Sequence, residues 1–196
     1  MARLAQAFGM QIVVYNSLPR LTTSDREDKN WYQPGSGDPD GSIPRAYFHG
    51  QSMEELHAFL SQNLNILVLS LPLTGSTRHM IGEQELAIIN SKAPAFLVNV
   101  SRGPIINHDA LIASLKKGPA NGGLLAAALD VTEPEPLPED SELWRLPNVF
   151  ISPHVSSITP QTMGRAFKIL EDNLLRKSKG QEMINVVSNT VARHLM

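Results

Sequence analysis

One stretch of this chain decides its fold: Phe96-Leu97-Val98-Asn99-Val100, followed by Ser101-Arg102-Gly103-Pro104. The first five residues are mostly apolar, which is typical of a strand that is buried on both faces of a sheet. The Gly-Pro pair then marks a turn, and a helix capped by Asn107 and ended by Gly118 follows it. A buried strand that leads through a turn into a helix predicts one unit of a parallel α/β sheet.

The same alternation repeats on both sides of this unit. Apolar runs predict strands at residues 11–15, 46–49, 66–71, 125–129 and 149–152, and helices at residues 53–60, 83–89 and 159–180. The last helix is expected to start with Thr159 as its cap and Pro160 at its first position. Its apolar residues form one stripe at helical spacing: Met163, Ala166, Phe167, Leu170 and Leu174. Residues 1–8 are expected to end a helix that Gly9 closes, and the Pro- and Gly-rich residues 16–44 are expected to be irregular. The predicted fold class is α/β, a Rossmann-type doubly wound parallel sheet.

Composition excludes several classes of function. The 196 residues carry a formal net charge of -2 and no stripe of Lys and Arg, so nucleic acid is not an expected partner. The absence of cysteine excludes disulfide bonds, thiolate catalysis and Cys-ligated zinc, and no other metal site is expected. The longest apolar run, residues 64–73, is too short to span a bilayer, and the start has no signal-peptide pattern. We expect a cytoplasmic protein that binds a small molecule.

Three polar residues follow three of the predicted strands: Arg102, Glu135 and His154. The carboxyl ends of parallel strands meet at one edge of a sheet, where ligands bind. An arginine can hold a carboxylate in two parallel hydrogen bonds, and a carboxylate beside an imidazole stabilises the protonated ring. These groups suit the reduction of a 2-oxo acid by hydride from a nicotinamide. Individually, the arginine could be a surface or turn residue and the glutamate a solvated charge.

Five other histidines lack such a position and are expected to be surface or packing residues. They are His49, His57, His79, His108 and His194.

The sequence resembles the D-isomer-specific 2-hydroxyacid dehydrogenases. The resemblance is carried by Val98 to Gly103 with Ala110-Leu111, Ala128 to Leu137, Leu143-Trp144, Pro147-Asn148-Val149 and Ser152-Pro153-His154. It extends over about residues 1–187, and residues 34–41 resemble an insertion of fungal-type members. It implies NAD(P)-dependent interconversion of a 2-oxo acid and a D-2-hydroxy acid. It also implies that Arg102 binds substrate, that Glu135 orients and tunes His154, and that His154 donates or accepts the proton.

The resemblance also implies a set of cofactor-binding residues. They are Asn16, Arg20, Pro72, Thr77, the backbone of Val100 and Ser101, Arg102, Asp130 and His154. Asn16 stands where NAD-specific members have an acid, and the lack of a carboxylate together with nearby Arg20 favours NADP over NAD. Ordinary alternatives remain open, namely a strand-ending turn for Pro72 and Thr77 and a loop cap for Asp130.

One departure from the family concerns its Gly-rich loop, which lies between the first strand and the first helix. Met1 falls inside the matching helix, so we expect residues 1–158 to form an incomplete dinucleotide-binding domain that lacks this strand and loop. Residues 159–196 are expected to form a C-terminal helix and tail that would return to a missing substrate domain. In the order 3-2-1-4-5-6 the missing strand is central, which leaves the strands at 11–15 and 66–71 with unpaired edges unless they meet.

Three hypotheses follow from this departure. The first is an oxidoreductase acting on a small 2-oxo or 2-hydroxy acid, with weak cofactor binding and slow or absent turnover. The second is a non-catalytic interaction subunit, or a remnant, that pairs with a full-length relative. The third is an artefact of the gene boundary. A homodimer is the assembly that the resemblance suggests, and the sequence does not identify the 2-oxo acid.

Overall fold

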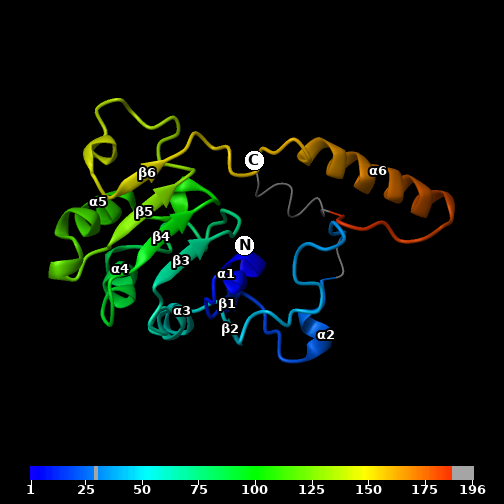
Figure 1. The fold of residues 1–196 in the computed structure, drawn as a ribbon, viewed down its shortest axis with the longest axis horizontal. Coiled ribbons are helices and arrows are strands. Elements are labelled where there is room, and N and C mark those ends of the chain that lie inside the picture. Colours follow the sequence, from blue (N-terminus) through cyan, green and yellow to red (C-terminus); the bar gives the residue numbers. More distant parts are fainter. Residues whose placement is uncertain (29–30, 187–196) are drawn as a thin grey trace. The chain divides into compact units, whose positions relative to one another are not determined.

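The computed structural model describes residues 1–28 and 31–186 of the chain. Their contacts group them into two compact units (Figure 1). One unit holds the chain up to Phe59 together with the segment from Thr159 onward, and the other holds Leu60–Ile158. The predicted division of the chain at residue 158 stays a prediction.

The second unit is built on a four-stranded parallel sheet. In spatial order its strands are β3 (Ile66–Leu69), β4 (Phe96–Asn99), β5 (Ala126–Leu129) and β6 (Val149–Ile151). The connections contain helices α4 (Glu83–Ile89) and α5 (His108–Lys117) and the 3-10 turns η1 (Gly103–Ile105), η2 (Pro119–Asn121) and η3 (Glu142–Arg145). Asn107 caps α5 and Gly118 ends it. The predicted parallel α/β sheet is confirmed.

The two faces of this sheet differ in burial. Leu97, in the middle of β4, is fully buried, as are Leu111 of α5 and, nearly so, Leu86 of α4. On the opposite face Val68 is 39% exposed and Phe150 67% exposed. The core of this unit therefore lies between the sheet and helices α4 and α5 (Figure 1).

The first unit contains a two-stranded parallel sheet of β1 (Val13–Asn16) and β2 (Ala46–His49). Helix α1 (Ala2–Ala7) precedes it and ends before Gly9, whose φ of +76° is the left-handed conformation that glycine adopts easily. Helix α3 (Met53–Leu60) follows β2. In the part of the chain that the structure describes, β1 and β3 belong to separate sheets.

The expected irregular stretch contains a short helix that the sequence analysis missed, α2 (Thr23–Arg26). The backbone N–H of Asp25 donates to the Thr22 hydroxyl (3.2 Å), and the backbone N–H of Thr22 donates to the Asp25 carboxylate (2.8 Å). This reciprocal capping box satisfies two backbone donors at the start of the helix. The Thr-x-x-Asp spacing was the available signal.

The last helix, α6 (Thr162–Ser178), begins later than predicted. Thr159 was expected to cap it, with Pro160 in its first turn, but Gln161 takes the cap position. The backbone N–H of Thr162 instead donates to the Thr159 carbonyl (3.0 Å), which closes a turn before the helix. The predicted apolar stripe is present but exposed. Met163, Phe167, Leu170 and Leu174 are 64%, 62%, 54% and 60% exposed.

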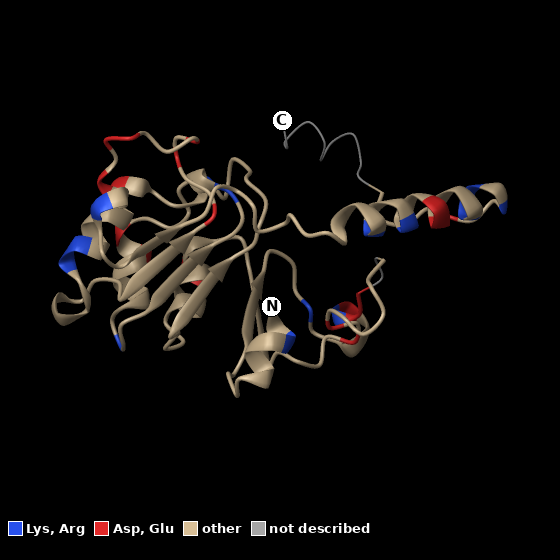
Figure 2. Ribbon diagram, turned by 45° about the horizontal axis from the view of Figure 1, so that its top comes forward, with Lys and Arg blue, Asp and Glu red and all other residues tan. Residues whose placement is uncertain are grey.

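Basic and acidic residues are both spread along the chain, and neither sign covers a whole unit (Figure 2). Acidic positions gather in the loop after β5, while both signs occur along α6 (Figure 2). Among the described helices, none combines the length and apolar character needed to cross a bilayer.

Candidate active site

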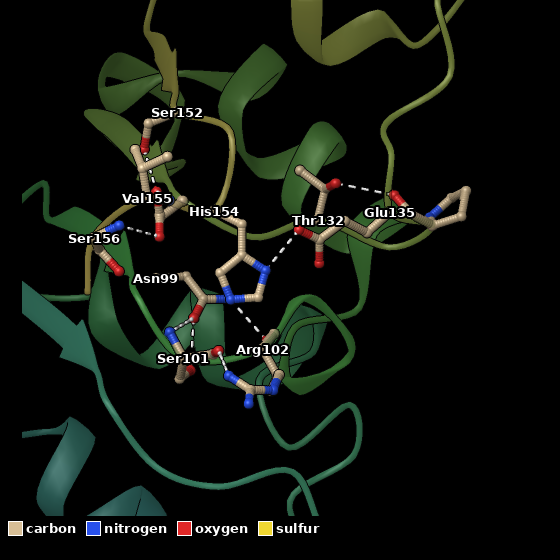
Figure 3. A network of polar contacts seen from close by, with 11 residues as sticks. Asn99, Ser101, Arg102, Thr132, Glu135, Ser152, His154, Val155 and Ser156 are labelled. Carbon is tan, nitrogen blue, oxygen red and sulfur yellow. Dashed lines mark hydrogen bonds and ion pairs between the residues drawn. The ribbon is translucent and has the colours of Figure 1, made fainter. Parts of the chain in front are cut away.

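The three residues singled out by the sequence follow the three adjacent strands β4, β5 and β6, at their carboxyl ends (Figure 3). Nδ1 of His154 lies 2.9 Å from Oε1 of Glu135. The two side chains are 44% and 40% exposed, so the pair is open to a ligand. The imidazole projects from its loop toward the turn that carries Arg102 (Figure 3). The structure therefore brings the predicted histidine and glutamate into direct contact.

The backbone of His154 adopts an unusual conformation, with a φ of +53°. For a residue with a bulky side chain this left-handed conformation costs about 1–3 kcal/mol, and it persists only where the surroundings impose it. Its backbone N–H donates to the carbonyl of Asp130 (2.9 Å). The next two N–H groups, of Val155 and Ser156, donate to the Asp130 carboxylate, both at 2.9 Å. Asp130 thus holds the turn that aims the imidazole.

Asp130 itself is almost fully buried, with 4% exposure. Its carboxylate also accepts a hydrogen bond from the Ser152 hydroxyl (2.6 Å). Burial alone raises the pKa of Asp130, but the hydrogen bonds from Ser152, Ser156 and Val155 lower it well below the ordinary range of an aspartate. These contacts agree with the ordinary alternative for Asp130, in which its side chain caps a loop. Contact of Asp130 with the cofactor stays a prediction.

The turn that carries Arg102 is organised by Asn99, which is fully buried at the end of β4. Its side-chain oxygen accepts from the N–H and the hydroxyl of Ser101, and its amide donates to the Arg102 carbonyl (3.0 Å). The guanidinium donates from Nη1 to the Ser101 carbonyl (2.7 Å). Arg102 is exposed, and no carboxylate of the described residues pairs with it. It therefore has donors left for an anion.

Asn99 did not emerge from the sequence analysis. The signal was present, because Asn99 is the one polar residue among the five positions of residues 96–100. A buried polar side chain needs hydrogen-bond partners, and a tight turn at a strand end offers several.

The predicted cofactor residues Pro72 and Thr77 lie in one turn after β3. The Thr77 hydroxyl donates to the Pro72 carbonyl (2.8 Å) and accepts from the N–H of Thr74 (2.7 Å). The structure therefore brings Pro72 and Thr77 together, and the Thr77 hydroxyl forms its hydrogen bonds within the turn. The N–H of Val100, which follows β4, donates to the carbonyl of Leu69 at the end of β3 (3.2 Å). This bond links the ends of the two strands.

The predicted residues Asn16 and Arg20 lie in the first unit. The side-chain nitrogen of Asn16, at the end of β1, is buried and has no hydrogen-bond partner among the described residues. An unsatisfied buried donor suits an acceptor supplied by a ligand, such as a ribose hydroxyl or a phosphate. Arg20 donates to the carbonyl of Asp25 (2.9 Å) and lines a polar hollow in which acidic residues outnumber basic ones. The preference for NADP therefore depends more on Asn16 than on Arg20.

Two histidines expected to be ordinary surface or packing residues have a specific partner, Glu133. Nε2 of His79 lies 2.7 Å from the Glu133 carboxylate, and the backbone N–H of Glu133 donates to the ring of His108 (3.2 Å). Burial lowers the pKa of His108, which favours the neutral ring that can accept this bond. Of the other histidines, His194 lies outside the described residues.

The fold and the site together define a class: an α/β dinucleotide-binding domain with a histidine–glutamate pair and an available arginine at the carboxyl edge of its sheet. The family described as "D-isomer specific 2-hydroxyacid dehydrogenase, NAD binding domain" matches residues 38–156. The chain belongs to the D-isomer-specific 2-hydroxyacid dehydrogenase family, as its resemblance predicted.

Individual relatives agree with this assignment. Glyoxylate/hydroxypyruvate reductase B from Enterobacter agglomerans is 43% identical over 134 residues, which cover 68% of this chain and 40% of that protein. Glyoxylate reductase from Korarchaeum cryptofilum is 33% identical over 192 residues, 98% of this chain and 49% of that protein. A crystal structure of a D-isomer specific 2-hydroxyacid dehydrogenase from Xanthobacter autotrophicus Py2, in complex with NADPH and MES, aligns with a TM-score of 0.64 and 29% identity. This alignment covers 95% of this chain and 78% of that chain. The chain spans less than half the length of the two reductases.

Proposed function

We propose that this chain supplies the NAD(P)-binding and proton-transferring part of a 2-hydroxyacid dehydrogenase. The reaction is the reduction of a small 2-oxo acid to a D-2-hydroxy acid, or its reverse. The observation that carries the proposal is the 2.9 Å contact between His154 and Glu135 at the carboxyl edge of a dinucleotide-binding sheet. The names of the relatives support glyoxylate or hydroxypyruvate as the 2-oxo acid.

Each residue of the site has a role in this proposal. Arg102 binds the substrate carboxylate through its remaining guanidinium donors and polarises the adjacent carbonyl. The carboxylate of Glu135 accepts a hydrogen bond from Nδ1–H of His154, which leaves Nε2 to exchange a proton with substrate. When bound, the nicotinamide supplies or accepts the hydride. In the reducing direction His154 gives its proton to the carbonyl oxygen, and the product is an uncharged hydroxyl.

The cofactor is proposed to be NADP or NAD, with a preference for NADP. Asn16 offers an unpaired amide donor where an acid would repel the 2′-phosphate of NADP. The turns after β3 and β4 would contribute further cofactor contacts, through Pro72, Thr77 and the backbone of Val100 and Ser101. NADPH in the complex of the Xanthobacter relative supports this choice.

We also propose a homodimer and a cytoplasmic location. The exposed apolar stripe of α6 supports association with a second polypeptide, because such stripes are normally covered in soluble proteins. Light scattering at several protein concentrations tests the dimer, and a monomer throughout would oppose it.

The experiment that tests the proposed reaction uses protein in excess over NADPH, so that slow turnover is measured. Loss of absorbance at 340 nm is followed with glyoxylate, hydroxypyruvate or buffer, and the product is identified by chromatography. The proposal predicts cofactor oxidation that depends on the 2-oxo acid and forms the 2-hydroxy acid in equal amount. A folded protein that forms no 2-hydroxy acid from either compound would contradict it.

A further inference from the structure

Glu133 connects its own loop to the loop after β3 and to the start of helix α5. Its carboxylate accepts from Nη2 of Arg78 (2.6 Å) through one oxygen and contacts Nε2 of His79 (2.7 Å) through the other. Its backbone N–H donates to the ring of His108, the first residue of α5. Burial raises the pKa of Glu133, whereas the hydrogen bond from His79 and the charge of Arg78 lower it, with a net pKa below its ordinary value. The ionised carboxylate is thus the form that both partners favour.

The residues around Glu133 are held closely in place. The backbone at Gly103 approaches Thr132 so closely that a Cβ atom there would lie 1.9 Å from the Thr132 carbonyl oxygen. The N–H of His79 donates to the carbonyl of Pro104 (2.7 Å), and His79 has a φ of +51°. A histidine in this left-handed conformation requires such fixed neighbours. The turn beyond Arg102, the segment at His79 and the loop after β5 therefore form one packed junction.

Glu135 lies two residues beyond this junction and has few contacts of its own. Its side chain is 40% exposed, and its described interaction is the one with His154. Pro134 separates it from Glu133, and its ring restricts the backbone between them. The Thr132 hydroxyl also donates to the Pro134 carbonyl (2.9 Å). Glu133 is therefore the nearest side chain on this side of Glu135 that is anchored to other segments.

We propose that Glu133 is a positioning residue: by binding Arg78 and His79 it holds the loop after β5 in the position from which Glu135 contacts His154. Through the same bonds it links this loop to the turn that holds Thr77. The effect on catalysis rests on the proposed function, whereas the effect on the His154–Glu135 contact does not. Glu133 acts on the reaction only through Glu135.

The test compares the unmodified chain with Glu133→Ala, Glu133→Gln and Arg78→Met. The matched control is Glu139→Gln, a change at an exposed carboxylate of the same loop. The readout is the pair of ¹⁵N chemical shifts of the His154 ring, measured by NMR at alkaline pH, where imidazoles are neutral. These shifts report which ring nitrogen carries the proton. If Glu133 stabilises the loop without affecting the position of Glu135, its replacement would not alter the His154 ring shifts.

In the unmodified chain and in Glu139→Gln the proton is expected on Nδ1, facing Glu135. In Glu133→Ala the Nδ1–H form should fall to a mixture with Nε2–H, and Arg78→Met should shift the mixture in the same direction. Glu133→Gln keeps the side-chain length and one oxygen acceptor, so it should restore part of the Nδ1–H form. If the reductase reaction is observed, kcat of Glu133→Ala should fall about tenfold, with KM for NADPH nearly unchanged.

Unchanged His154 ring shifts in a folded Glu133→Ala protein would overturn the proposal. If this variant does not fold, unchanged shifts in Arg78→Met together with Glu133→Gln would overturn it equally. Absence of turnover in every variant contradicts the proposed function alone, because the ring shifts still decide whether Glu133 positions Glu135.

Discussion

Nδ1 of His154 lies 2.9 Å from Oε1 of Glu135, although the two residues are 19 positions apart in the chain. The contact exists because β5 and β6 are adjacent and parallel, so that the loops after them leave the same edge of the sheet. Asp130, the first residue after β5, binds both the backbone and the neighbours of His154. One strand end thus supplies both the glutamate and the support of the histidine.

Replacing Glu135 by glutamine should lower the rate of 2-oxo acid reduction about 10- to 100-fold. The amide keeps the shape of the side chain but loses the charge that stabilises protonated His154, and proton transfer by such groups contributes about 10²–10⁴-fold. The initial rate of NADPH oxidation at saturating substrate measures the effect. Glu139→Gln should retain the rate of the unmodified chain, and an equal rate in Glu135→Gln would exclude a role for its charge.

Replacing Arg102 by lysine should raise KM for glyoxylate about 100-fold, a much larger change than any loss of affinity for NADPH. Lysine keeps the charge but loses the planar fork that binds a carboxylate through two hydrogen bonds. Steady-state kinetics and a separate cofactor titration measure the two quantities. Arg145→Lys, at an exposed position outside the site, is the matched control. An unchanged KM would place the substrate carboxylate elsewhere.

Replacing Asp130 by asparagine should lower the free energy of unfolding at pH 7 by about 2–3 kcal/mol, the size of hydrogen bonds to a charged group. The pKa of Asp130 is lower in the folded chain than the value of about 3.9 for an unfolded aspartate. Its contribution is therefore complete above about pH 4 and is lost as pH falls further. Urea unfolding at pH 7, 4 and 2.5 measures this.

The difference between the unmodified chain and Asp130→Asn should accordingly shrink between pH 4 and pH 2.5. A difference that stays constant over this range would show that the charge of Asp130 is not what stabilises the turn.

Replacing Gly103 by alanine should destabilise the second unit by about 1–3 kcal/mol, the usual cost of overpacking. The added Cβ would meet the backbone of Thr132, which cannot move aside as a flexible side chain would. Gly75→Ala is the matched control, because no atom lies within 4 Å of the position of its Cβ. Thermal unfolding followed by circular dichroism compares the two, and equal midpoints would contradict the close packing of these loops.

Replacing Asn16 by aspartate should reduce the affinity for NADPH at least tenfold relative to that for NADH. A carboxylate there would repel the 2′-phosphate and could bind the ribose hydroxyls instead. Titrations of both cofactors, with Asn63→Asp as a control, measure the ratio. An unchanged ratio would remove Asn16 from the cofactor site.

Much of the fold could be predicted from the sequence. Three predicted elements have the same bounds in the structure, namely β2 (46–49), α3 (53–60) and α4 (83–89). Apolar periodicity and capping residues mark these elements locally. The start of α6 was wrong, since Thr159 and Pro160 form a plausible cap in sequence but the chain closes a turn there instead. Local patterns do not distinguish these two arrangements.

The site shows a similar division. The strand ends and the family signatures were enough to predict that Arg102, Glu135 and His154 lie at one edge of the sheet. Glu133 and His79, in contrast, are 54 positions apart, and each has an ordinary local explanation. Their contact depends on the packing of two loops, which no periodicity in the chain reveals. Contacts of this kind become visible only in three dimensions.

The most direct test of the proposed reaction is a comparison of His154→Asn with the unmodified chain, with protein in excess over NADPH. Asparagine removes the imidazole at the sheet edge, and His57→Asn, on α3, is the control. The unmodified chain and the control should oxidise NADPH in a glyoxylate-dependent reaction, and the rate in His154→Asn should be at least 100-fold lower. Equal rates in all three proteins would contradict the proposed reaction.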